Sequence, residues 1–255
     1  MAQKDIHPHA RPIALKGRGD TAFLLIHGYT GSPTDFNGLP AYLREQLDAS
    51  VFVPLLPGHG TKVEDLHGLT KNDFIKTAEE ALQPLLTQYK RIIVGGHSFG
   101  GQVALHLAAR YPVHGVVVSA TPYRPAFPLN IPGFYELWHL LTKKEFLNKR
   151  FSAEEKRARA VSDAFSYDRM AVYGLKLTLD INKDLKNLLP NVKSPLLSFF
   201  LRGDWIAHVG SAEAIEGAVA SGVKKKHIIE SLEHGIFFTK DAPHVYREVV
   251  EFFKI

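Results

Sequence analysis

Short apolar segments alternate with helical segments along this chain, and the alternation limits its fold more than any other feature. Runs rich in β-branched and aromatic residues predict strands near residues 22–27, 50–56, 91–96, 115–120, 195–201 and 226–230. Amphipathic stretches predict helices near 37–48, 72–88, 99–110, 209–220 and 243–254. Because parallel strands need crossover connections, this order predicts an α/β fold with a mostly parallel central sheet flanked by helices on both faces.

One interval departs from the alternation. More than 70 residues separate the predicted strand that ends at Ala120 from the one that starts at Pro195, which is far longer than an ordinary loop. We therefore expect a core made of residues 1–121 and 191–255, interrupted by a small helical lid at 122–190.

A serine lies at the centre of a G-x-S-x-G motif, between a predicted strand and a predicted helix. The motif is GHSFG at residues 96–100, and it follows the strand-like RIIVG. Gly96 and Gly100 lack Cβ atoms, so the two elements can approach closely while Ser98 takes a strained backbone conformation. This context is that of a nucleophile elbow. The alternative is a glycine-rich turn with an incidental serine.

A second loop offers the donors that such a serine needs. An acyl-transferring nucleophile requires backbone N–H groups that stabilise the oxyanion developing on the substrate carbonyl. We expect one donor from Phe99 and the other from Tyr29, in the HGYTG segment that follows the strand at 22–27. An ordinary strand-to-helix loop is the alternative for the second segment.

The acid and the base of a triad are expected downstream, in the order serine, acid, histidine. Asp204 directly follows a predicted strand, where parallel sheets place functional groups, and His234 follows the next one. Asp204 is expected to orient His234, which takes the proton from Ser98. The rival histidines are His208, His227 and His244, and the rival acids on predicted helices are Asp180, Asp184 and Asp241.

Together these motifs resemble the α/β-hydrolase superfamily over nearly the whole chain, and more narrowly the small bacterial carboxylesterases and monoacylglycerol lipases. The resemblance rests on HGYTG at 27–31, LPGHGTKVEDL at 56–66, GHSFGG at 96–101, Asp204 and His234. It implies the triad, the oxyanion donors and the lid. Many relatives carry glycine where this chain has Glu233, and a smaller residue where it has His97. For His59, a pocket-flanking role and a plain turn both stay open.

The resemblance implies a serine hydrolase that cleaves carboxylic esters of short to medium acyl chains through an acyl-enzyme intermediate. It implies no metal and no organic cofactor. A monoacylglycerol lipase with a longer acyl preference is the alternative. A thioesterase or a carbon–carbon bond hydrolase is less favoured, and a non-catalytic binding protein is least favoured, because all three triad members are present.

The predicted lid contains apolar side chains at helical spacing, namely Phe134, Trp138 and Leu141. They can attach the lid to the core, or they can line an acyl pocket above Ser98, which is the role we assign them. Transient contact with micelles or membrane surfaces is a third interpretation. A charged helix is predicted near 153–165, followed by a third stretch of the lid near 169–179.

Composition agrees with a small-molecule enzyme. The formal net charge is +5, and the basic clusters have acidic neighbours, which argues against a nucleic-acid partner. The chain has no cysteine, so disulfides, thiolate metal sites and a cysteine nucleophile are excluded. The first ten residues lack an apolar targeting segment. We expect a cytoplasmic protein, and the sequence indicates no oligomeric state.

Overall fold

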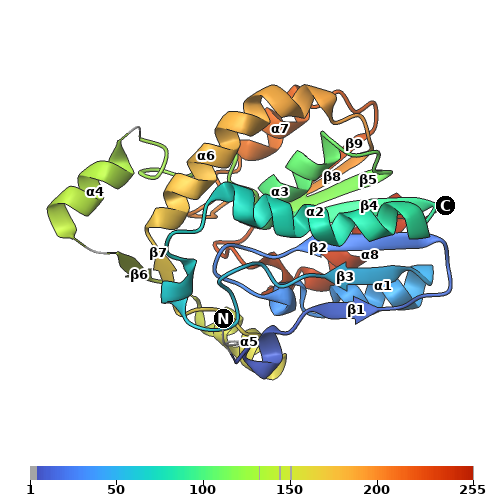
Figure 1. Ribbon diagram of the computed structural model, residues 1–255, viewed down its shortest axis with the longest axis horizontal. Helices are drawn as coiled ribbons and strands as arrows, with labels where there is room; N and C mark the ends of the chain where they lie inside the picture. Colours follow the sequence, from blue (N-terminus) through green and yellow to red (C-terminus); the bar gives the residue numbers. More distant parts are fainter. Residues whose placement is uncertain (1–4, 132, 144, 150, 255) are drawn as a thin grey trace.

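A seven-stranded sheet runs through the computed structural model, which describes residues 5–131, 133–143, 145–149 and 151–254 (Figure 1). In this described part the strand order is β1-β3-β2-β4-β5-β8-β9. The strands are β1 (Ile13–Leu15), β2 (Thr21–Ile26), β3 (Ser50–Val53), β4 (Arg91–His97), β5 (Gly115–Ser119), β8 (Leu196–Leu201) and β9 (Lys224–Ile229). Neighbours pair in parallel except β1 with β3, so the predicted fold class is confirmed.

Helices cover both faces of the sheet. One face carries α1 (Leu39–Leu47) and α8 (Ala242–Phe253), and the other carries α2 (Lys71–Gln88), α3 (Phe99–Ala108), α6 (Tyr173–Leu188) and α7 (Ser211–Ala218). Successive side chains of a strand point to opposite faces. In β2, Leu24 and Ile26 therefore join the core beneath α2 and α3, while Phe23 and Leu25 join the core beneath α1 and α8. This two-sided burial explains why the strands read as continuous apolar runs.

The long insertion between β5 and β8 has its own elements. They are α4 (Phe134–Thr142), β6 (Phe146–Asn148), α5 (Ala153–Val161), β7 (Arg169–Ala171) and α6. In Figure 1, α4 projects from the edge of the molecule, whereas α6 lies along the sheet beside α3. The short strands β6 and β7 pair antiparallel and were not predicted, nor was β1. Each has three residues, which is too short to show an alternating pattern.

The second half of the insertion is integrated into the core. Leu177, Ile181 and Leu185 of α6 are buried in the same cluster as the side chains of α3. The lid boundaries at 122 and 190 stay a prediction, and so does the extent of the core at 1–121 and 191–255. Residues 1–4 and 255 of that core lie outside the described part. Among the described helices, none combines the length and apolarity needed to cross a bilayer.

Candidate active site

Ser98 occupies a strained turn between β4 and α3. Its backbone has a φ of +54°, which side-chain-bearing residues rarely adopt, and α3 begins at the next residue. The Ser98 N–H donates to the Ser119 carbonyl of β5 at 2.8 Å, so the turn is tied to the sheet. A Cβ at Gly100 would lie 1.9 Å from the Ile26 carbonyl oxygen. Glycine at this position is therefore required for α3 to pack against β2.

The three predicted triad residues form one hydrogen-bonded chain. The Ser98 hydroxyl lies 2.8 Å from His234 Nε2, and His234 Nδ1 lies 2.7 Å from Asp204 Oδ2. A carboxylate only accepts hydrogen bonds, so Nδ1 carries the proton and Nε2 is free to accept from the serine hydroxyl. The arrangement suits proton removal from Ser98.

Backbone donors fix Asp204 in place. Its second oxygen, Oδ1, accepts the N–H groups of Ile206 at 2.8 Å and Ala207 at 3.1 Å. The Asp204 side chain is fully buried, whereas His234 keeps 18% exposure. The carboxylate therefore has one orientation, and the imidazole edge that faces Ser98 stays accessible to a substrate or water.

The proposed oxyanion loop is held by a buried carboxylate. Asp35 Oδ2 accepts the Gly28 N–H at 3.1 Å. The same carboxylate packs against Gly31, where a Cβ would lie only 1.7 Å from Oδ2. His27 supports the loop from behind, because Nε2 accepts the Leu56 N–H at 3.0 Å while Nδ1 lies 2.9 Å from the Gly28 carbonyl. Tyr29 and Phe99 both border the cavity beside Ser98.

His59 lies behind the oxyanion loop and not in the cavity wall. Its Nε2 forms a short hydrogen bond with the Tyr29 carbonyl, and Nδ1 lies 2.9 Å from the Pro57 carbonyl. Burial lowers the pKa of His59 to about 3, with repulsion from His27 as the second cause. A ring that is neutral at ordinary pH has one N–H and can donate to only one of these two carbonyls. The sequence left a pocket-flanking role and a plain turn open for His59; the structure instead places it behind the loop, in contact with the Tyr29 carbonyl.

His97 packs against His234. The two ring centroids are 5.0 Å apart, and His97 Nδ1 lies 3.1 Å from the Ser119 hydroxyl. Burial, followed by repulsion from His234, lowers the pKa of His97 well below its usual range. His97 therefore stays neutral and adds no charge beside His234.

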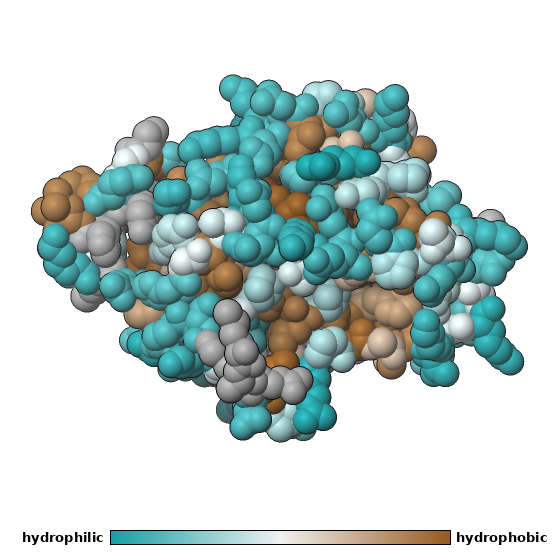
Figure 2. Space-filling view, in the orientation of Figure 1, coloured by the Kyte–Doolittle hydropathy of each residue, from teal (hydrophilic) through white to brown (hydrophobic). Residues whose placement is uncertain are grey.

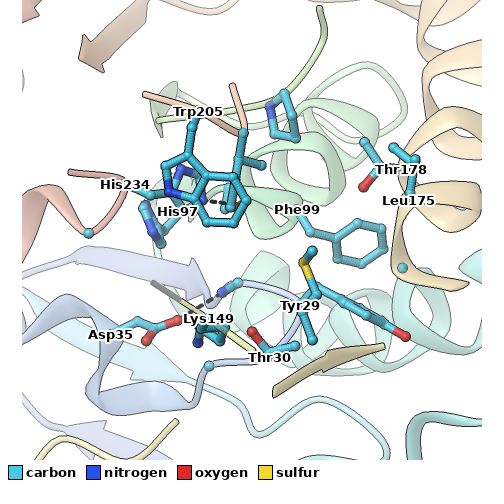
Figure 3. A pocket seen from close by; sticks show the side chains of 18 of the residues that line it. Tyr29, Thr30, Asp35, His97, Phe99, Lys149, Leu175, Thr178, Trp205 and His234 are labelled. Carbon is cyan, nitrogen blue, oxygen red and sulfur yellow. Dashed lines mark hydrogen bonds between the residues drawn. The ribbon is translucent and has the colours of Figure 1, made fainter. Parts of the chain in front are cut away.

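A cavity of about 950 Å³, including its mouth, opens in front of Ser98. Its two sides differ in chemistry. In Figure 3, Phe99, Leu175 and Thr178 lie on one side, while Asp35 and Lys149 lie on the other. Further apolar walls come from Pro122, Pro125, Leu129, Met170, Trp205 and Ile206.

The charged side joins the core to the insertion. Arg159 of α5 donates to Glu155 at 2.8 Å and lies 3.7 Å from Asp35. Burial raises the pKa of Glu155 to about 7, although Arg159 acts against this shift. Burial lowers the pKa of Lys149 to about 8, and repulsion from Arg159 adds to the effect.

The predicted lid contacts need a correction. Phe134 and Trp138 pack on each other with centroids 6.0 Å apart, and Leu141 is 73% exposed; none of the three lines the cavity. Their helix α4 lies at the outer end of the insertion, whereas α6 and β7 lie next to the site and supply Leu175 and Met170 (Figure 1). Helical spacing reveals an apolar face but not the element that covers it.

The rival residues lie elsewhere. His208, His227, His244, Asp180, Asp184 and Asp241 do not border this cavity. His227, His244 and Glu248 bring their potential ligand atoms within 4.8 Å of one another, a grouping that could hold a metal ion away from Ser98. Sequence reasoning missed Asp35, Lys149, Glu155 and Arg159, which occur in no recognised motif.

Comparison with known proteins agrees with this geometry. Residues 23–248 match the model of the alpha/beta hydrolase family, so the chain belongs to that family. A carboxylesterase of Bacillus subtilis (strain 168) is 27% identical over 244 residues, which is 95% of each chain. A thermostable monoacylglycerol lipase of Bacillus sp. (strain H-257) is 27% identical over 237 residues, covering 92% of this chain and 91% of the lipase.

A solved structure of a metagenome-derived lipolytic enzyme has a similar fold. It superposes with a TM-score of 0.83 and 23% identity, and the match covers 97% of this chain and 98% of that one. The resemblance to carboxylesterases and monoacylglycerol lipases that the motifs indicated is thereby confirmed.

Proposed function

We propose that this protein is a carboxylic ester hydrolase whose nucleophile is Ser98. The observation that carries the proposal is the hydrogen-bonded chain from Ser98 through His234 to Asp204 at the wall of a partly apolar cavity. The similarity to a carboxylesterase and a monoacylglycerol lipase supports the same class of reaction.

The geometry suits a two-step mechanism. His234 Nε2 accepts the Ser98 proton while the serine oxygen attacks the ester carbonyl, and the N–H groups of Tyr29 and Phe99 stabilise the oxyanion. His234 then protonates the departing alcohol. In the second step it activates a water molecule, which releases the acid and restores Ser98. Asp204 stabilises the imidazolium formed in each step, and no metal or organic cofactor takes part.

The apolar side of the cavity suits a short to medium acyl chain. Met170, Leu175 and Ile206 offer contacts to methylene groups, while the charged side offers hydrogen-bond partners to the alcohol. A monoacylglycerol lipase is the second candidate, because a polar side next to Ser98 suits an alcohol that carries hydroxyl groups. Its longer acyl chain would extend along α6.

Hydrolysis of p-nitrophenyl esters and monoacylglycerols by wild type and Ser98→Ala tests the proposal. We expect Ser98→Ala to fold normally and to lower kcat by roughly a millionfold, because triad members act as a unit. Ser162→Ala, which lies on the insertion and away from the cavity, is the matched control and should keep full activity. More than a few per cent of activity in Ser98→Ala, free of contaminating esterase, would exclude Ser98 as the nucleophile.

We also propose that the α4 end of the insertion touches lipid aggregates transiently. Figure 2 shows apolar side chains gathered at this end. The exposed residues on and directly before α4 are Ile131, Leu137, Leu140 and Leu141. Leu140→Glu/Leu141→Glu should weaken sedimentation with phosphatidylcholine vesicles and leave p-nitrophenyl butyrate hydrolysis unchanged. Equal sedimentation of both proteins would contradict the proposal.

A further inference from the structure

Lys149 places an incompletely satisfied ammonium group at the cavity. Its Nζ donates to the Ser166 hydroxyl at 3.3 Å, which is long for such a bond, and lies 4.9 Å above the Phe151 ring. An ammonium group has three donors. In the part of the chain that the structure describes, no carboxylate lies within ion-pair distance of this group. Donors therefore remain for a ligand.

The carboxylates of the same side are already engaged. Asp35 accepts the Gly28 N–H, and Glu155 accepts from Arg159 at 2.8 Å. Their side chains are only 6% and 2% exposed. Both carboxylates are paired with Arg159 and act on Lys149 only from beyond ion-pair distance, where they favour its charged form.

A second cation reinforces the positive wall. Arg159 Nη1 is buried and has no hydrogen-bond partner, although Asp35 lies 3.7 Å away. The Arg159 guanidinium lies 4.7 Å from the Phe151 ring centroid, so Phe151 contacts both Lys149 and Arg159. Burying a cation is costly unless a counter-charge or hydrogen bond compensates for it. Asp35 and Glu155 offset the charge of Arg159, whereas Lys149 on the same ring has no ion-pair partner among the described residues. The remaining positive charge of Lys149 therefore favours an anionic ligand.

We propose that Lys149, Arg159 and Phe151 form a subsite for a carboxylate or phosphate group carried on the alcohol portion of the ester. The inference rests on the proposed ester hydrolysis at Ser98. An acyl chain is best placed along the apolar side of the cavity, which leaves the charged side for the alcohol (Figure 3). The subsite selects esters by an ion pair with the leaving group.

The preference should depend on pH. The charged and titratable groups around Lys149 are Arg159, Asp35, Glu155, Asp168 and His97, and Glu233 lies against Glu155. Lys149, with a pKa of about 8, is charged below that pH, and Glu155, with a pKa of about 7, loses its negative charge below neutrality. Selectivity for an anionic alcohol should therefore be greatest below pH 7 and should decline as the pH rises through 8.

Two substrates of equal size test the subsite. Butyryloxyacetate and butyryloxyacetamide share the acyl group and differ in the charge of the alcohol. Wild type should favour the anion in kcat/KM, and Lys149→Met should reduce that preference about tenfold, mainly by raising KM for the anion. Lys149→Arg should retain most of the preference. Lys156→Met, an exposed lysine on α5, is the control and should match wild type.

A second pair of substrates separates the two anions. 1-Butyrylglycerol 3-phosphate is compared with 1-butyrylglycerol, and a dependence on Lys149 in either pair supports the subsite and identifies its ligand as carboxylate or phosphate. The subsite would be excluded if Lys149→Met lowered kcat/KM equally for charged and neutral substrates, or lowered it in neither pair. The neutral esters also report on ester hydrolysis itself, so failure of the subsite and failure of the proposed function are distinguishable.

Discussion

At the scale of single residues, Asp204 determines which nitrogen of His234 carries the proton. Its Oδ2 holds His234 Nδ1 at 2.7 Å while two backbone N–H groups fix its other oxygen. Asp204→Asn presents an amide that can donate to Nδ1 and favour the wrong tautomer. We expect kcat to fall by about 10³ to 10⁴ with little change in KM. Steady-state kinetics on p-nitrophenyl butyrate measures this effect.

His234→Ala should approach the loss seen with Ser98→Ala, and His208→Ala and His244→Ala serve as matched controls. If one of these controls were inactive and His234→Ala active, the assignment of the base would be wrong.

The triad positions could be predicted because each lies beside a strand end that the sequence marks clearly. Ser98 is enclosed by glycines that only a tight strand-to-helix turn requires, Asp204 follows the apolar strand β8, and His234 follows β9, which is apolar only at its last residues. The charged side of the cavity had no such marker. Lys149, Glu155 and Arg159 come from the insertion and approach Ser98 only through tertiary packing.

At the scale of elements, the structure changes the expectation for the acyl pocket. Leu175 of α6 lines the cavity, whereas Trp138 of α4 does not. Leu175→Ala should weaken long-chain esters more than acetyl esters, since each lost methylene contact is worth about 0.8 kcal/mol, or roughly fourfold in rate. Trp138→Ala should leave the chain-length profile unchanged. The measurement is kcat/KM across C2 to C12 p-nitrophenyl esters.

Equal thermal stability of each variant and wild type is the control for this comparison. If the chain-length profile changed with Trp138→Ala and not with Leu175→Ala, α4 rather than α6 would line the acyl pocket.

The order of elements in the insertion could be predicted only in part. Helical periodicity indicated α4 and α5, but a pattern of apolar residues cannot distinguish a helix that covers the site from one at the edge.

At the scale of the whole molecule, buried neutral histidines should make the fold sensitive to acid. Burial is the largest cause that lowers the pKa of His27, His59 and His97. Histidines whose pKa is lowered in the folded protein stabilise it above about pH 6.5. This contribution is lost as the pH falls, because the unfolded chain then gains protons that the folded chain does not. Glu155, with its raised pKa, acts in the opposite direction between about pH 7 and 4.5.

The histidines outnumber the single opposing carboxyl. The free energy of unfolding should therefore decrease by about 1–3 kcal/mol per pH unit between pH 6 and 5, since one proton corresponds to about 1.4 kcal/mol per unit. Urea unfolding at pH 8, 7, 6 and 5 measures this dependence. His59→Gln should flatten it, and a stability that is constant or rises toward pH 5 would contradict the account.

The central claim, that Ser98 is the activated nucleophile of a hydrolase, has a direct chemical measurement. A fluorophosphonate probe reacts with an activated serine, and mass spectrometry of the digested protein locates the adduct. We predict one adduct, on the peptide that contains Ser98, with labelling strongly slowed in His234→Ala and abolished in Ser98→Ala. Labelling at another serine, or none under conditions in which the ester is hydrolysed, would contradict the claim.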